Sequence, residues 1–276
     1  MRRRAVIITI TMAVFSAVMW LFGSGGVARA TRSGQPFALL AAAPEIARAD
    51  SAVALPDLPS GGAATDKPSE LPLTVLSEGA PSRNEIALTF DDGPHPGYTE
   101  KLLKILGERH VKATFFLVGK MVEVAGDLVQ REVAEGHEVG NHTYSHVCLK
   151  TATAEQADLE LRKCQAVVET LTGKRMDICR PPGGVFNREA VQIVKQLGMM
   201  TVLWTCDPAD YEDIPGNEIL SRTLPNLSPG GIVLLHDGIQ GTVDALPQII
   251  TACERHGFKF VTCTEMASHK AEGAAR

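Results

Sequence analysis

The chain has 276 residues, 45% of them hydrophobic, and a formal net charge of −5 at pH 7. This length and composition are typical of a globular protein with one substantial core, and they exclude an intrinsically disordered chain. Acidic and basic residues are interspersed, without the basic stripe that follows a phosphate backbone, so we expect no nucleic acid among its partners.

Residues 1–30 have the pattern of an export signal. Arginines at positions 2 to 4 precede an apolar run over residues 5–22, and Ala28-Arg29-Ala30 supplies a cleavage site. The apolar run is longer than a usual signal core and slightly shorter than a membrane span, so two alternatives stay open: a cleaved signal peptide and a retained membrane anchor. In both cases we expect the folded part to be exported, as a periplasmic, cell-wall-associated or secreted protein.

The rest of the chain divides into a linker, one folded domain and a short tail. Residues 31–83 are rich in Ala, Pro, Ser and Gly and have no sustained helical or strand period, which predicts a flexible linker. Residues 84–267 carry regular apolar patterns and form the predicted domain, which we expect to be monomeric. Residues 268–276 follow as a C-terminal tail.

Within this domain, apolar runs typical of strands alternate with amphipathic segments typical of helices. Thr153 and Gln156 have the spacing of a capping box that opens a helix running to about Leu171, and Asn187 is the predicted N-cap of another helix. The alternation predicts an α/β fold with a parallel sheet, open or closed into a barrel. The predicted strands cover residues 85–90, 113–118, 138–141, 176–179, 200–205, 231–235 and 259–261.

Polar and charged side chains follow most of these strands at the point where each strand ends. In parallel α/β folds the carboxyl ends of the strands meet at one face of the sheet, so we expect these side chains to gather there. They are Asp91 and Asp92, His142 and His146, Arg180, Asp207 and Asp210, and His236 and Asp237.

Two histidines and one carboxylate in this group could form a metal site. His142 and His146 are four residues apart, which would place them on one side of a helical turn, although such a pair can equally cap a turn or pack in the core. Asp91 or Asp92 would supply the third ligand, even though Asp-Asp-Gly-Pro is by itself more typical of a turn. Two histidines and one aspartate leave coordination positions open, as catalytic metal sites require.

The six cysteines leave two alternatives open. In an exported protein they could form up to three disulfides, whose pairing cannot be deduced from the sequence. They could equally be buried thiols that pack as small apolar side chains. No Cys-x-x-Cys pair is present, so a cysteine zinc site has little support.

Five segments of the predicted domain form an ordered set of motifs. They are Thr89-Phe90-Asp91-Asp92-Gly93-Pro94, His142-Thr143-Tyr144-Ser145-His146, Arg180-Pro181-Pro182-Gly183-Gly184, Asp207-Pro208-Ala209-Asp210-Tyr211 and Leu234-Leu235-His236. Together they resemble, in order, the motifs of the polysaccharide deacetylases of carbohydrate esterase family 4, which include the nodulation-type chitooligosaccharide deacetylases. The resemblance covers residues 84 to 266. Any one segment could arise by chance, but five in sequence with consistent strand placement make a coincidental match very improbable.

This resemblance implies a fold and a metal site. The fold would be a distorted (β/α) barrel with fewer than eight strands, which agrees with the seven predicted here. The metal ligands would be Asp92, His142 and His146, holding a divalent ion with zinc as the default and cobalt or manganese as alternatives. Asp91 would be the base that takes a proton from the attacking water.

The resemblance also implies roles for the remaining motif residues. Arg180 would hold Asp91 ionised and oriented, because its guanidinium fork suits a carboxylate. His236 would be the general acid that protonates the leaving amine, and Asp210 would bind its other ring nitrogen. The backbone N–H of Gly183 would stabilise the developing oxyanion.

The expected substrate pocket is less well defined. Tyr211, Leu234 and Trp204 would wall the space for the acetyl methyl group, although such residues at strand ends are more often part of the core. Gly183 departs from the family pattern, which commonly has an aromatic residue there, so a side-chain contact with the sugar is lost.

These motifs predict a metal-dependent deacetylase acting on N-acetylglucosamine units of peptidoglycan, chitin oligomers or poly-N-acetylglucosamine. Two alternatives stay open: an O-acetyl xylan esterase, and a catalytically silent wall-binding protein on the same fold. A periplasmic solute-binding protein would explain export and the α/β alternation but not the ordered motifs.

Overall fold

A computed structural model of the chain describes residues 75–274. The predicted signal segment, residues 1–30, and linker residues 31–74 lie outside the described residues. Within the part that is described, no helix is long and apolar enough to cross a membrane.

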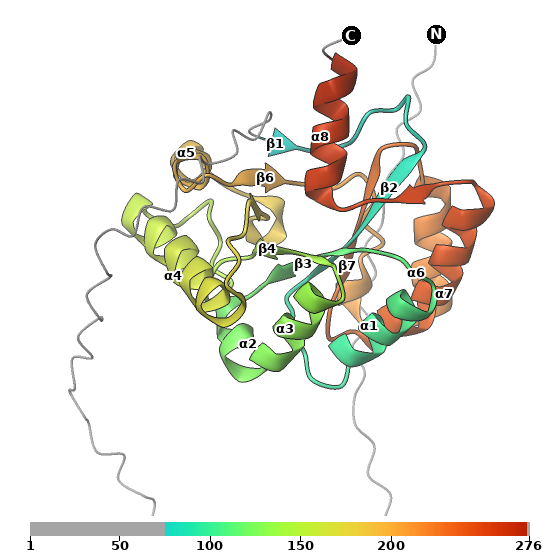
Figure 1. The fold of residues 1–276 in the computed structure, drawn as a ribbon, viewed down its shortest axis with the longest axis horizontal. Coiled ribbons are helices and arrows are strands. Elements are labelled where there is room, and N and C mark those ends of the chain that lie inside the picture. Colours follow the sequence, from blue (N-terminus) through green and yellow to red (C-terminus); the bar gives the residue numbers. More distant parts are fainter. Residues whose placement is uncertain (1–74, 275–276) are drawn as a thin grey trace, which may run out of the picture. The chain divides into compact units, whose positions relative to one another are not determined.

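The described residues form an eight-stranded sheet in which every pairing is parallel (Figure 1). The strand order is β1-β6-β5-β4-β3-β2-β7, and β8 pairs with the start of β2. The predicted α/β fold with about seven parallel strands is confirmed. The strands are β1 (Val75–Leu76), β2 (Glu85–Asp91), β3 (Thr114–Leu117), β4 (Glu138–Asn141), β5 (Ile178–Cys179), β6 (Met200–Val202), β7 (Gly231–His236) and β8 (Lys259–Phe260).

The sheet is not closed into a barrel, because its edge strands, β1 and β7, are not paired with each other. One isolated bridge, between Cys206 and Val233, links the segment after β6 to β7. The sheet is therefore an open, distorted relative of a barrel in which the segment after β6 lies beside the middle of β7.

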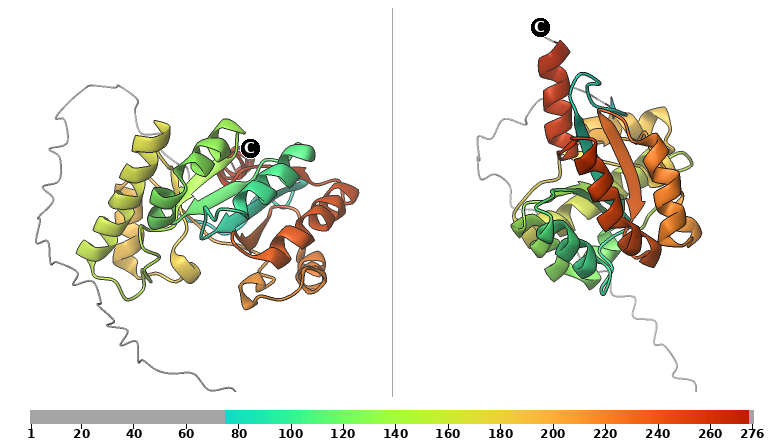
Figure 2. Two further views of the ribbon diagram at one scale, coloured as in Figure 1. Left: turned by 90° about the horizontal axis from the view of Figure 1, so that it is seen from below. Right: turned by 90° about the vertical axis from the view of Figure 1, so that its right-hand side faces the viewer.

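Helices flank the sheet, as the two further views in Figure 2 show. Two helix starts agree with the sequence: Thr153 forms a complete capping box with Gln156, and the Asn187 side chain accepts a hydrogen bond from Ala190 N. The helices are α1 (Thr99–Glu108), α2 (Gly119–Val124), α3 (Gly126–Ala134), α4 (Ala154–Thr172), α5 (Arg188–Gln196), α6 (Gly216–Thr223), α7 (Gln240–Arg255) and α8 (Cys263–Ala274).

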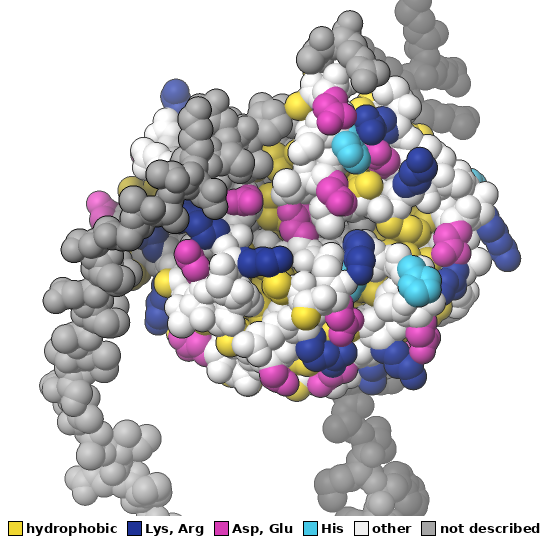
Figure 3. Space-filling view, viewed as in Figure 1, with side chains coloured by type: hydrophobic (Ala, Val, Ile, Leu, Met, Phe, Trp, Pro, Cys, Tyr) yellow, Lys and Arg dark blue, Asp and Glu magenta, His cyan; other side chains and the backbone are white. Residues whose placement is uncertain are grey.

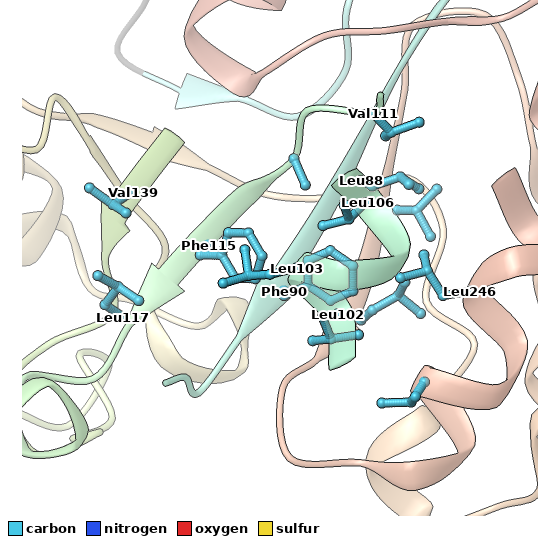
Figure 4. Close-up of a cluster of buried hydrophobic side chains, with 14 of the residues drawn as sticks. Leu88, Phe90, Leu102, Leu103, Leu106, Val111, Phe115, Leu117, Val139 and Leu246 are labelled. Carbon is cyan, nitrogen blue, oxygen red and sulfur yellow. The ribbon is translucent and has the colours of Figure 1, made fainter. Parts of the chain in front are cut away.

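Strand β2 is the centre of the core, because every one of its residues is buried. Leu88 and Phe90 pack in a cluster with α1 and α7 (Figure 4). Ala87 belongs to a second cluster of buried side chains. The rings of Phe90 and Phe115 stack with their centroids 5.1 Å apart. Each large apolar side chain buried this way contributes about 1.5–3 kcal/mol. The strand that ends at Asp91 is therefore held rigidly.

The predicted boundaries of the domain are wrong at both ends. Residues 75 and 76, assigned to the linker, form β1, which pairs with β6 and buries Leu76 completely. Residues 268–274, assigned to the tail, belong to α8, where His269 is paired with Glu85 and Lys270 donates to Glu78 O. The prediction failed because a two-residue strand has no period to detect and the last turns of α8 are mostly polar.

On the face in Figure 3, acidic and basic side chains are interspersed, as the sequence predicts.

All six cysteines are free; Cys148 is exposed and the other five are buried. For those five, the alternative of buried thiols is the one observed.

Candidate functional site

The carboxyl ends of β2, β4, β5 and β7 each deliver predicted site residues. Asp91 and His236 are the last residues of β2 and β7 and are directly paired in the register of these two strands. His142 and Arg180 directly follow β4 and β5, and Arg180 N donates to Asn141 O at 2.9 Å. Residues far apart in the sequence thus meet because the parallel sheet aligns the ends of its strands.

Asp92, His142 and His146 form a cluster suited to a cation. One ligand atom from each lies within 4.8 Å of the other two. Asp92 Oδ1 is 3.4 Å from His142 Nε2 and 3.1 Å from His146 Nε2, yet this buried oxygen has no hydrogen-bond partner among residues 75–274. A carboxylate oxygen and two ring nitrogens that converge without bonding one another fit a divalent metal ion.

The charges in this cluster favour the ionised, ligating form of Asp92. Burial opposes ionisation of Asp92, but the two imidazoles outweigh it and hold the pKa of Asp92 well below its usual range. His142 is almost fully buried, whereas the His146 side chain is 48% exposed, so one side of the cluster opens to solvent. Water or substrate could therefore reach a bound ion.

The two histidines do not share a helical turn as predicted. The segment is a loop in which Thr143 and His146 have positive φ angles of 66° and 57°. Asn141 Oδ1 accepts from Thr143 N, and the Thr143 hydroxyl accepts from Val147 N. These bonds stabilise left-handed backbone that non-glycine residues seldom adopt, and they turn both rings toward Asp92.

A hydrogen bond to Arg180, the first residue of the third motif, orients the His142 ring. Its Nδ1 donates to the carbonyl oxygen of Arg180 at 2.7 Å. This bond places the ring proton on Nδ1 and leaves the Nε2 lone pair directed at the cluster, as metal-ligating histidines require.

Asp91 and Arg180 form a buried ion pair beside this cluster. Arg180 Nη1 donates to Asp91 Oδ1 at 2.7 Å and to the Thr89 hydroxyl at 2.7 Å. The Arg180 side chain is fully buried, its Nη2 donates to Leu203 O, and its guanidinium lies 4.2 Å from the Phe116 ring centroid. Asp91 Oδ2 remains on the cluster side, 3.7 Å from His142 Nε2.

His236 and Asp210 form a second pair on the β7 side. His236 Nδ1 lies 2.7 Å from Asp210 Oδ1, and Asp210 Oδ2 accepts from His236 N and from the Thr242 hydroxyl. Burial lowers the pKa of His236, but its bond to Asp210 and the charges of Asp91 and Asp92 outweigh it, so the pKa is raised. The ring is thus held with Nε2 free to carry a second proton.

The predicted pocket residues lie in different environments. Tyr211 is 55% exposed and its ring meets the His236 ring edge-on at 5.4 Å. Trp204 is partly buried beneath Gly184, where an added Cβ would lie 2.4 Å from the Trp204 ring. Leu234 is buried in β7, and Gly183 is exposed with a φ of 65°, where an added Cβ would meet only Val185 Cγ2, at 3.9 Å.

Several residues of the site were given no role in the sequence analysis. Thr89, Asn141 and Thr242 each support a motif residue through a side-chain hydrogen bond, and Asp237, noted without a role, bonds the loop that carries Asp92. Threonine and asparagine are common at strand and helix ends, so no signal in one sequence distinguishes these. Asp237 could have been found, since it lies next to His236.

Comparison with known proteins provides independent evidence for the family to which this chain belongs. A family model described as polysaccharide deacetylase matches residues 78–202. A peptidoglycan-N-acetylglucosamine deacetylase from Bacillus cereus is 36% identical over 190 residues, which cover 67% of this chain and 89% of that protein. A chitooligosaccharide deacetylase from Azorhizobium caulinodans is 30% identical over 204 residues, covering 67% of this chain and 97% of that protein.

Solved structures give the same result. A carbohydrate esterase family 4 pseudoenzyme from Bacillus anthracis matches with a TM-score of 0.68 and 31% identity, over 71% of this chain and 69% of that chain. That protein is described as a pseudoenzyme, so the fold by itself does not establish catalysis and the side chains of the site have to decide.

Proposed function

Because this chain belongs to the polysaccharide deacetylases of carbohydrate esterase family 4, a family of metal-dependent hydrolases, we propose that it removes acetyl groups from N-acetylglucosamine units of a cell-wall or extracellular glycan. Peptidoglycan, chitin oligomers and poly-N-acetylglucosamine are the candidate substrates. Relatives named for peptidoglycan and for chitooligosaccharides support the first two.

The metal would be held by Asp92, His142 and His146, with zinc as the proposed ion and cobalt or manganese as alternatives. When bound, the ion supplies Lewis acidity that makes water a nucleophile at neutral pH and polarises the acetamide carbonyl. The buried, unpartnered Asp92 Oδ1 is the observation that best supports this assignment.

Asp91 is the proposed general base. Its Oδ1 is occupied by Arg180, which leaves Oδ2 on the side of the metal cluster to take the proton from water as it attacks the acetyl carbon. Arg180 fixes the direction of this carboxylate. The negative charge that develops on the carbonyl oxygen would be met by the backbone N–H of Gly183.

His236 is the proposed general acid. Its Nε2 would give a proton to the sugar nitrogen as the carbon–nitrogen bond breaks, producing a free amine and acetate. Asp210 favours the protonated ring, and the Thr242 hydroxyl fixes Asp210. Tyr211 would form one wall of the pocket beside His236, with Trp204 and Leu234 deeper.

Residues 1–30 would export the protein, either as a cleaved signal peptide or as an anchor through residues 5–22, and it would act as a monomer. This location agrees with a cell-wall substrate. The presence of the ligands, the base and the acid in one arrangement is what supports an active enzyme over a silent wall-binding protein.

Acetate release tests the proposal. The purified protein would be assayed on peptidoglycan, chitin oligomers, poly-N-acetylglucosamine and acetylxylan, after chelation and again after addition of Zn²⁺. We expect zinc-dependent release from an N-acetylated glycan. Release from acetylxylan alone would favour the esterase alternative, and no release from any glycan would contradict the proposal.

A further inference from the structure

Asp237 links the strand of the proposed acid to the loop of the proposed metal ligand. It directly follows His236 at the end of β7 and is only 2% exposed. Its backbone N–H donates to Asp91 O at 2.9 Å, which extends the pairing of β7 with β2 by one residue. Any residue could make that backbone bond, so its side chain has to explain why a buried carboxyl group is present.

The Asp237 side chain holds the segment that leads from the metal ligand into α1. Its Oδ2 accepts from the Thr99 hydroxyl at 2.5 Å and lies 3.4 Å from the donor His95 N. Thr99 is the first residue of α1 and is itself fully buried. A carboxyl group taken out of water is costly unless it is bonded. These contacts satisfy Oδ2, whereas the buried Oδ1 has no hydrogen-bond partner among the described residues.

The same oxygen packs against Gly93, the residue after Asp92. A Cβ added at Gly93 would lie 2.6 Å from Asp237 Oδ2, which is too close for any real side chain. Gly93 has no positive φ, so glycine is required here by space and not by backbone conformation. Gly93 O also accepts from Val118 N, the residue after β3, at 3.0 Å. The Asp92–Gly93 loop is therefore held between the end of β3 and Asp237, and we call these contacts the clamp.

This clamp acts on strained backbone. Asp92 has a φ of 73°, in the left-handed region that is unfavourable for a non-glycine residue and persists only when its surroundings impose it. Release of the clamp would let Asp92 relax and withdraw its oxygen from His142 and His146.

We propose that Asp237 is a positioning residue that holds the Asp92–Gly93 loop in the geometry needed for metal binding and keeps it in register with His236. The inference rests on the proposed function for its catalytic consequence, but its first consequence concerns metal affinity alone. Asp237 touches neither the metal ligands' binding atoms nor substrate, and it acts through Gly93, His95 and Thr99.

Zinc titration of the metal-free protein tests this without any glycan. We expect Asp237→Ala to weaken Zn²⁺ binding about 10- to 100-fold, the range found when residues behind metal ligands are removed. Asp237→Asn should stay close to the native affinity, because its amide oxygen accepts the same two hydrogen bonds. Asp207→Ala is the matched control: Asp207 is exposed and accepts from Ala209 N within its own turn, so zinc affinity should not change.

Unfolding measured on each variant separates this role from a loss of stability. Native zinc affinity in a folded Asp237→Ala protein would overturn the proposal, as would an equal loss in Asp237→Asn and Asp237→Ala. If Asp237→Ala does not fold, Thr99→Val removes the hydroxyl donor instead and should still weaken Zn²⁺ binding. A shift in zinc affinity together with no activity on any glycan would count against the proposed function while supporting this inference.

Discussion

The carbonyl oxygen of Arg180 lies 2.7 Å from His142 Nδ1, while the guanidinium of the same residue binds Asp91. One residue therefore supports the metal ligand through its backbone and the base through its side chain. Because a substitution changes only the side chain, these two roles can be separated by experiment.

Arg180→Met should retain metal and lose turnover. The backbone bond to His142 survives, so zinc affinity should stay within a few-fold of native. Asp91 would be left buried without its partner, which should lower the free energy of unfolding by about 3–5 kcal/mol. Urea denaturation and acetate release measure both effects, and Asp91→Asn added to Arg180→Met should recover part of the stability.

The two adjacent aspartates should separate by metal content. Asp92→Asn and His142→Ala each remove a proposed ligand and should lower bound zinc. Asp91→Asn removes only the base, so the metal should remain while acetate release stops. Elemental analysis of the purified variants decides this, and loss of metal in Asp91→Asn with retention in Asp92→Asn would reverse the two roles.

His236→Ala should have effects that depend on the leaving group. An amine leaves poorly unless it is protonated, so turnover of an N-acetylated sugar should fall by about 10² to 10⁴. An aryl acetate, whose leaving group departs without a proton, should lose much less. Equal losses on both substrates would mean that His236 acts in binding or structure.

Asp210→Asn should shift the pH profile of turnover. In the native protein the carboxylate helps to raise the pKa of His236, so the ring stays protonated to higher pH. Loss of that charge lowers the pKa of His236, and the alkaline limb of the kcat profile should move to lower pH. An unchanged alkaline limb would assign that limb to another group.

Glu132→Gln should stabilise the protein at neutral pH without altering catalysis. Glu132 is fully buried in α3, and neither carboxyl oxygen has a hydrogen-bond partner in the part of the chain that the structure describes. Burial, followed by the charges of Asp237 and Glu135, raises the pKa of Glu132 well above the usual range. The folded state keeps this proton while the unfolded state releases it above about pH 4.5. Native stability should therefore fall relative to the variant by about 1.4 kcal/mol for each pH unit above that point. A constant difference between pH 5 and 7 would contradict this.

The sequence was sufficient where a pattern extends over several residues. Strand β2 and helix α4 have clear apolar periods or caps, and the five motifs identified Asp92, His142 and His146 before their geometry was known. Prediction from the sequence failed where tertiary contacts determine the backbone conformation. The loop from His142 to His146 has helical spacing, but bonds from Asn141 impose left-handed backbone instead.

The side chains that hold the site residues in place could not be predicted from the sequence either. Thr242 binds Asp210 and Asp237 binds Thr99 across segments far apart in the chain, and the second of these pairs follows from the register of β7 with β2. A single sequence carries no record of that register. Leu76 was missed for a related reason, because burial of one leucine against β6 leaves no local pattern.

The position of β2 between β3 and β7 has a consequence for how the enzyme is assembled. Its partner β3 follows closely in the chain, but Thr89 bonds Val233, which is 144 residues away in sequence. Closing so long a loop is slow, so the β7 edge of β2 should be the last part of the centre to form. A nascent chain that ends before residue 231 would carry the metal ligands but no proton donor, and its central strand would present an unpaired edge open to aggregation.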